Sequence, residues 1–179
     1  MCNEIIRRVW LWIGGLSLAF LIMTGISGAQ ERATIQATAT VVSSLTVIGT
    51  NNLQFGTVTP GTNKSVDKST VGFAGEWSIT GTSSAELDIQ WVLPDSLKTA
   101  DSLSAMRINF NSTDASYSTG AGTQSSPNGI FNPNGPVVQR LGAGGAMTIW
   151  IGGTVFPRIS QTGGDYAADV MLIVAYTGS

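Results

Sequence analysis

The sequence has 179 residues, and charged side chains make up 11% of it, against roughly 25% in an ordinary soluble protein. It contains no histidine, and its one cysteine is Cys2. Ser-His-Asp triads, disulfides within the chain and zinc sites built on Cys or His are therefore excluded. An enzyme is the least expected class, because a catalytic base would have to be a carboxylate, Lys or Tyr.

The first 29 residues have the pattern of a secretory leader. Two arginines precede an uncharged run over Val9–Ile26, and the small residues Ser27–Ala29 follow it. A positive start, an apolar middle and a small-residue exit are typical of a signal peptide. We expect a signal peptide helix that is cleaved between Ala29 and Gln30, which also removes Cys2 and excludes a cysteine nucleophile.

An uncleaved membrane anchor is the alternative, because an uncharged run of this length nearly spans a bilayer. The run is diluted by Gly14, Gly15, Ser17, Thr24 and Gly25, so we favour cleavage and membrane contact only during export. A lipid anchor is disfavoured, because Cys2 precedes the apolar run. Cleavage leaves 30–179 as one domain, long enough to bury about 70% of its unfolded surface.

Beyond the leader, seven basic residues stand against ten acidic ones, a balance that gives no attraction to nucleic acid. Apolar residues recur there at every second position, the period of a half-buried strand. Clear examples are Trp77 and Ile79; Leu87, Ile89, Trp91 and Leu93; and Met106, Ile108 and Phe110. No stretch after the leader keeps the spacing of a helix.

Glycine and proline punctuate this pattern, as turns between strands require. We expect strands near 33–48, 53–57, 65–71, 76–81, 86–93, 105–111, 137–141, 146–156 and 166–177. Short strands at this spacing predict an all-β fold, a single antiparallel β-sandwich of immunoglobulin-like architecture without its disulfide; a barrel is second. Gly152 and Gly153 indicate a bulge or a close backbone contact.

Residues 111–136 interrupt the alternation and are rich in Ser, Gly, Asn and Pro. A mobile surface loop tied down at Ile130 and Phe131 is favoured over a binding loop, because charged or convergent polar groups do not cluster there. The pairs Asp95 with Asp101 and Asp165 with Asp169 have no catalytic spacing and are interpreted as turn carboxylates. We expect no cofactor and no metal site.

Trp150 alternates with the apolar residues around it in the segment 146–156. We expect it to pack on the second face of its strand, as large aromatics usually do. The competing hypothesis makes Trp150 an exposed binding aromatic, which would stack on a sugar ring or anchor a partner.

The segment after the leader alternates small apolar residues with threonines. The apolar set is Ala33, Ile35, Ala37, Ala39 and Val41. A terminal strand of this kind pairs with its own sheet or is donated to the open edge of a neighbour. The small alanines argue mildly against donation into deep pockets.

The two ends of the predicted domain resemble those of the secreted bacterial domain of unknown function 4402. The resemblance rests on ATATVV at 37–42, LQFGTV at 53–58, MTIWIGGT at 147–154 and Gly164-Asp165-Tyr166 before a last strand that ends at Tyr176. It implies a secreted β-sandwich without an established activity, similar in general look to subunits of bacterial surface fibres. The 111–136 segment departs from the family's pattern.

The sequence thus leads to two functional hypotheses. The first is an exported structural or adhesive protein, a fimbria-like surface subunit assembled by edge-strand pairing with itself or with other subunits. Its location would be the periplasm, the cell surface or the extracellular space. The second is a monomeric secreted binding module for a glycan or surface polymer, using Trp150 or the 111–136 segment.

Overall fold

The computed structural model describes residues 36, 38, 39, 41 and 44–178. The chain divides into 1–39 and 40–179, and every described strand belongs to the second unit. The predicted signal peptide helix, the cleavage position between Ala29 and Gln30, and Ala33, Ile35 and Ala37 lie outside the described residues.

The described part of the chain is all-β, with twelve strands and no helix. In chain order the strands are β1 (Thr46–Asn51), β2 (Lys64–Val66), β3 (Gly75–Thr80), β4 (Glu86–Val92), β5 (Ser96–Lys98), β6 (Ala105–Asn109), β7 (Ala115–Ser118), β8 (Gly129–Phe131), β9 (Val137–Arg140), β10 (Ala146–Ile151), β11 (Gly153–Phe156) and β12 (Met171–Tyr176). The all-β prediction is confirmed.

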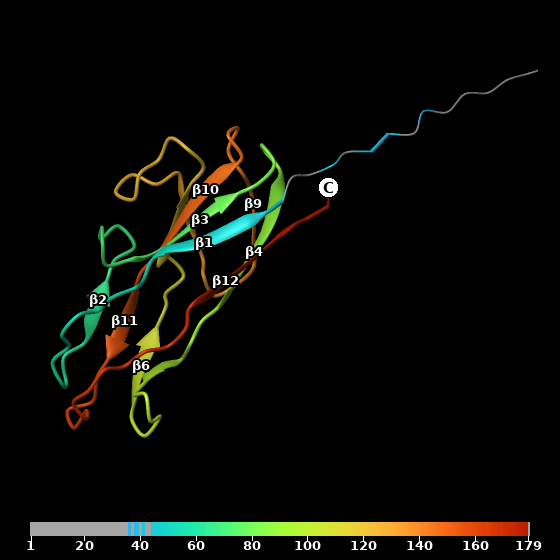
Figure 1. Ribbon diagram of the computed structural model, residues 1–179. Coiled ribbons are helices and arrows are strands. Elements are labelled where there is room, and N and C mark those ends of the chain that lie inside the picture. The colour runs from blue at the N-terminus through green and yellow to red at the C-terminus, as the bar shows by residue number, and fades with distance from the viewer. Residues whose placement is uncertain (1–35, 37, 40, 42–43, 179) are drawn as a thin grey trace, which may run out of the picture. The chain divides into compact units, whose positions relative to one another are not determined.

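These strands form three antiparallel sheets (Figure 1). Their orders are β1-β3-β10-β7-β8, β2-β11-β6-β5 and β12-β4-β9. Two of the shortest connections change sheet: Gly152 alone separates β10 from β11, and residues 93–95 separate β4 from β5. Strands that pass between sheets in this way are how a sandwich turns its corners.

One hydrophobic core joins the sheets, as the alternating pattern predicts. Ile79 of β3 and Ile149 of β10 come from the five-stranded sheet, and Leu87 and Ile89 of β4 come from the three-stranded sheet; all four are fully buried in one cluster. The fold is an antiparallel β-sandwich. Its core residues are those that the period of two placed on one face of each strand.

The ends of several expected strands are wrong. The described residues before Thr46 are not in a strand, so the strand expected over 33–48 is seen only in its last residues, as the start of β1. Residues 53–57 form no strand; Gln54 N donates to Phe73 O at 2.8 Å, but no ladder continues from it. The strand expected over 166–177 shortens to β12, with one isolated bridge earlier, at Ala167.

The 111–136 segment is not a loop throughout, which corrects the sequence interpretation. It contains β7 and β8, which pair with each other while β7 also pairs with β10. Tyr117 stacks on Phe131 with ring centroids 4.2 Å apart, and Ala115 is fully buried. Phe131 holds the segment, whereas Ile130 points outward and is 57% exposed. The small and polar residues of β7 hide it from a search for apolar alternation.

Gly152 separates β10 from β11 and makes the close backbone contact that was one of the two interpretations of Gly152 and Gly153. Its N–H donates to Asp114 O at 2.8 Å. A β-carbon at this position would meet backbone atoms of Val66 and Lys68 closer than atoms can approach. Glycine is therefore needed where the strand leaves one sheet for another.

Replacing Gly152 with alanine should destabilise the fold by about 1–3 kcal/mol, because the backbone of β2 must move away. Gly144→Ala is the matched control, since no atom lies within 4 Å of a β-carbon there, and it should change stability by less than about 0.5 kcal/mol. Urea unfolding followed by fluorescence measures both. Equal midpoints for the two variants would contradict the assignment.

Candidate functional site

Two strand edges meet at one side of the sandwich, and neither has a partner in the described part of the chain. β1 pairs only with β3, and β12 pairs only with β4. Figure 1 shows β1 and β12 as the strands that border this side. An unpaired edge presents a row of free backbone N–H and C=O groups, which is a template for another strand.

In β12, hydrogen bonding alternates along the strand. Thr177 N donates to Glu86 O at 3.2 Å, and the register continues through Ala175 opposite Asp88. In an antiparallel ladder every second residue bonds to a given neighbour. The backbone groups of Leu172 and Val174 therefore face the open side, with their side chains toward the core.

The same reasoning applies to β1. Gly81 N donates to Gly145 O at 2.8 Å, so the odd-numbered residues of β3 bond to β10 and the even-numbered ones to β1. Thr80 and Ser78 are opposite Thr46 and Ile48. The backbone groups of the intervening residues, Val47 and Gly49, consequently face the open side.

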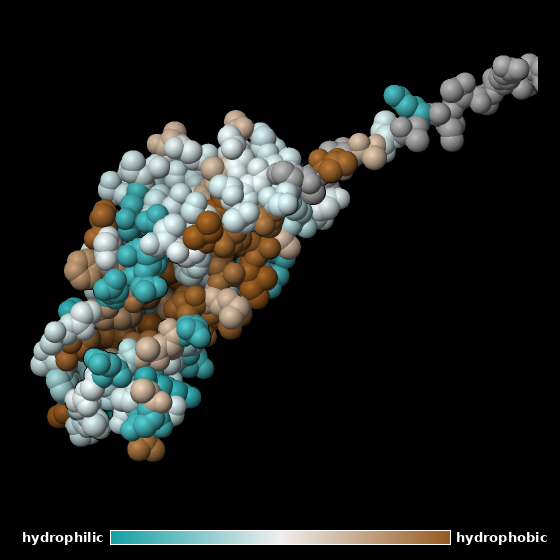
Figure 2. All heavy atoms as spheres, in the orientation of Figure 1, coloured by the Kyte–Doolittle hydropathy of each residue, from teal (hydrophilic) through white to brown (hydrophobic). Residues whose placement is uncertain are grey.

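A groove of about 1060 Å³ lies beside the end of β1 and the chain that leads into β12. Most of its lining comes from Gly49, residues 51–58 and residues 161–170, so it ends at Val170, the residue before β12. Its floor is formed by core residues, among them Ile108, Ile151 and Val155, each under 5% exposed. Figure 2 shows hydrophobic surface, hollowed in places, over the region between β1 and β12. The floor of the groove is thus part of the core and is already covered from water.

Apolar side chains line the groove without being fully covered. The partly buried ones are Leu53, Val58, Trp77, Leu97, Tyr166 and Val170. Along β12 the inward-facing Leu172 and Val174 also keep part of their surface in solvent. A strand laid over them would remove this area from water, which is favourable by roughly 25 cal/mol per Å².

Gly49 leaves the groove open beside Trp77. The two residues are register partners between β1 and β3. A β-carbon at Gly49 would lie 3.9 Å from Trp77 Cδ1, an ordinary contact distance. Glycine therefore adds no side chain over the indole, which is partly exposed in the lining of the groove.

Hydrogen bonds between polar groups stabilise the part of the groove lining formed by residues 161–166. Gln161 Nε2 donates to the Tyr166 hydroxyl at 2.7 Å, and this hydroxyl donates to Thr162 O at 2.7 Å. Asp165 and Asp169 are exposed residues of the lining. Among the described residues, Asp, Glu, His and Cys side chains form no group of three that could hold a metal ion. The arrangement is suited to binding an apolar segment.

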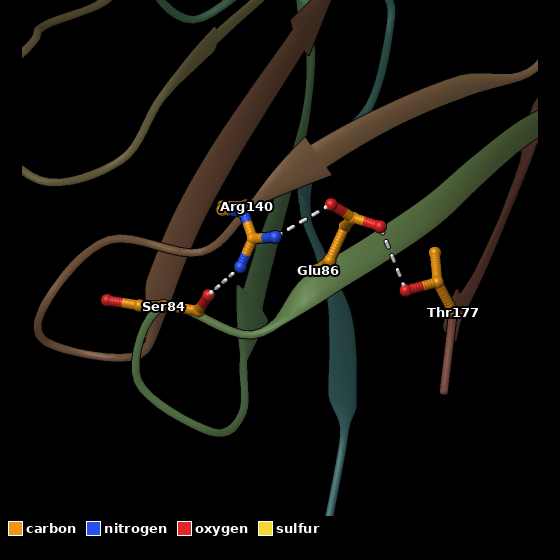
Figure 3. Close-up of polar contacts among 4 residues, drawn as sticks. All are labelled: Ser84, Glu86, Arg140 and Thr177. Atoms are coloured by element: carbon orange, nitrogen blue, oxygen red, sulfur yellow. Dashed lines mark hydrogen bonds and ion pairs between the residues drawn. The ribbon is translucent and has the colours of Figure 1, made fainter. Parts of the chain in front are cut away.

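Polar contacts hold the C-terminal end of β12, at Tyr176 and Thr177, against neighbouring residues. Thr82 N donates to the Tyr176 hydroxyl at 2.8 Å. Figure 3 shows Glu86 accepting hydrogen bonds from Arg140 at 3.0 Å and from Thr177 at 3.1 Å. The ion pair is exposed and contributes at most about 1 kcal/mol. The ion pair joins β9 to β4, whereas the Thr177 hydrogen bond holds the residue after β12 against β4.

Trp150 is buried, with 6% of its surface exposed, so the hypothesis of an exposed binding aromatic at Trp150 is wrong and the packing interpretation is confirmed. It belongs to β10, flanked by Glu76 of β3 and Ser116 of β7. It lies outside the main core cluster, on the sheet face opposite Ile149. Trp150 is shielded from solvent because β10 is the central strand of the five-stranded sheet, where the neighbouring Ser116 is buried as well.

The other carboxylates singled out in the sequence lie apart from one another. Asp101 accepts hydrogen bonds from the Thr99 hydroxyl at 2.7 Å and from Leu103 N at 3.1 Å. These bonds hold the pKa of Asp101 below its usual value. Asp101 therefore stabilises a turn.

A second, smaller hollow of about 380 Å³ lies beside Trp91. Asp95 and the residues 133–136 line it with Trp91 and its neighbours. Trp91 contacts Phe131 edge to face at a centroid distance of 5.9 Å. The 111–136 segment thus contributes to a concave surface, with an aromatic ring that is only partly buried.

Comparison with known proteins adds no name to these features. Protein-family models gave no match to the chain, and a search of curated proteins found no similar sequence. The described residues contain no helix that is long and apolar enough to cross a membrane.

Replacing Trp150 and Trp77 one at a time should distinguish a buried ring from one that lines the groove by the loss of stability. Trp150→Ala should destabilise the fold by about 3–5 kcal/mol, because it empties a buried site. Trp77→Ala removes a partly exposed ring and should cost about 1–2 kcal/mol. Thermal unfolding followed by circular dichroism measures both. A larger loss at Trp77 would contradict the assignment of this ring to an open groove.

Proposed function

We propose that this protein is an exported structural or adhesive subunit that assembles into a fimbria-like surface polymer by edge-strand pairing. One observation carries the proposal: within the described residues, β1 and β12 each have one unpaired edge, and partly buried apolar side chains that pack on the core, among them Trp77, Leu172 and Val174, lie beside these edges. A strand from another subunit would satisfy the backbone groups and cover the apolar side chains in one step.

The chemistry of the edges supports this function. Natural sheets protect exposed edges with charged residues, proline or very short strands. β2, β5 and β8 have three residues each, and β9 carries Arg140. In contrast, β1 and β12 have six residues each, without a charged residue or a proline. The two edges beside the groove are the ones without such protection.

The location follows from the leader. Its positive, apolar and small-residue parts support export across the inner membrane, to the periplasm, the cell surface or the extracellular space. The resemblance of both ends of the domain to the secreted bacterial domain of unknown function 4402 supports the same location. Partners would be further copies of this chain or other surface subunits.

Closing the groove with a charge should prevent assembly. We expect the wild-type chain, exported with its own leader, to form assemblies that grow with concentration. Gly49→Asp places a short carboxylate beside Trp77, and burying it unpaired under a new strand should weaken association about a hundredfold or more. Size exclusion with light scattering and negative-stain microscopy measure the assemblies.

Thr50→Asp is the matched control, because Thr50 is the exposed neighbour of Gly49 on the same strand. It should assemble like the wild type. Circular dichroism of both variants verifies that they fold. A wild-type chain that stays monomeric at every concentration would refute the proposed function, and so would Gly49→Asp assembling as well as Thr50→Asp.

The hollow beside Trp91 favours a second candidate, a monomeric secreted module that binds a glycan or surface polymer. An aromatic ring next to carboxylate and backbone groups is a common arrangement for stacking on a sugar. Binding on a glycan array that Trp91→Ala abolishes and Gly49→Asp leaves unchanged would favour this module over the assembly subunit.

A further inference from the structure

We propose that the occupant of the groove is the segment 33–41 of a second copy of this chain, inserted antiparallel to β12. The inference rests on the proposed function, since it names the strand that the assembly uses. The groove's shape, the sequence of the segment and the exposure of its described residues carry the argument.

The segment has the pattern that an inserted strand needs. Its odd-numbered residues are apolar and would face the groove floor, while its even-numbered residues, Thr34, Gln36, Thr38 and Thr40, would face solvent. Residues 33–48 include no charged side chain, so insertion buries no charge. Nine extended residues span about 30 Å, long enough to run along all six residues of β12.

Small side chains suit this groove. Trp77 and Tyr166 are large residues of its lining, and the floor residues Ile151 and Val155 are already fully buried. Alanines can cover such a floor without entering a deep pocket, whereas the sequence alone indicated that they mildly disfavour donation into deep pockets.

Those residues of the segment that the structure describes are exposed. Val41 is 92% exposed, and Gln36, Thr38 and Ala39 are exposed as well. To fold back beside β1, the chain would need a tight reversal shortly before Leu45. The sequence 30–48 contains no Gly, Asn, Asp or Pro, the residues that two-residue hairpin turns prefer. A segment from another copy needs no such reversal.

Antiparallel insertion beside β12 joins subunits head to tail. Every strand pairing in the described sandwich is antiparallel. Leu45 and Tyr176 both lie next to Gly81, so β1 begins where β12 ends. A donor antiparallel to β12 leaves the groove at the opposite end, near 161–170. Head-to-tail contacts of this kind produce a fibre when the rotation between subunits does not close a ring.

Disulfide trapping tests the occupant. The full chain is expressed with its own leader and with Cys2→Ser, so that introduced thiols are the only ones. Ile35→Cys, Ala37→Cys or Ala39→Cys is combined with Val170→Cys, at the groove end where the donor should leave. We expect a covalent ladder of dimers, trimers and higher species on a non-reducing gel, strongest for Ala39→Cys.

The pattern of products decides between the possibilities. A disulfide within one chain, seen as a faster monomer that reduction slows, would overturn insertion between copies. No disulfide in any combination would overturn the segment as occupant. Ala39→Cys with Ile130→Cys is the control, because Ile130 is exposed on β8, at the far end of the sheet from β1, and it should give no ladder.

A charge on the segment gives a second measurement. Ala39→Asp should weaken assembly about a hundredfold, whereas Thr38→Asp, on the face toward solvent, should change it less than about threefold. If Gly49→Asp blocks assembly while both segment variants assemble normally, the proposed function stands and this occupant is wrong. If the wild-type chain never assembles, the proposed function itself fails.

Discussion

The main constraint in this structure is that backbone hydrogen bonding between strands stops at two edges. In the described part of the chain β1 and β12 each have a single hydrogen-bonded neighbour, and partly buried side chains that pack on the core, among them Leu172 and Val174, lie beside the open edges. Backbone groups at Leu172 and Val174 face that opening, as do those at Val47 and Gly49. Hydrogen bonding and hydrophobic burial therefore favour the same event, the addition of a further strand. No other edge in the described part of the chain combines six residues, no charge and access to the core.

The rest of the molecule keeps this opening in a defined shape. The core residues Ile79, Leu87, Ile89 and Ile149 are fully buried and hold the five-stranded sheet against the three-stranded one. Gly152 brings β10 into β11 without a clash. The contacts of Tyr176 with Thr82 and of Thr177 with Glu86 hold the C-terminal end of β12, and the ion pair of Arg140 with Glu86 joins β9 to β4 (Figure 3). A groove held this rigidly loses little entropy when a strand enters, which favours affinity.

The structure changes the interpretation of the alanine-rich segment 33–41. From the sequence alone, its small side chains would fill deep pockets poorly. Beside a groove whose floor is already complete, they are suited to forming a thin covering layer, and its lack of charge removes the main energetic obstacle to burial. The tryptophan available to a partner is also a different one. Trp150 is buried within its sheet, whereas Gly49 leaves Trp77 partly exposed.

The period of two in the apolar residues was enough to predict an all-β sandwich and most of its core, because alternation decides which side chains share a face. It also identified Gly152 as a place of close backbone approach. Alternation is silent on which strands become neighbours, so it could not show that β1 and β12 lack partners, that Trp150 is covered, or that the weakly apolar β7 pairs with β8. These features depend on contacts between residues far apart in the chain. The groove exists only because the tertiary structure brings residues 49–58 and 161–170 to the same side of the core.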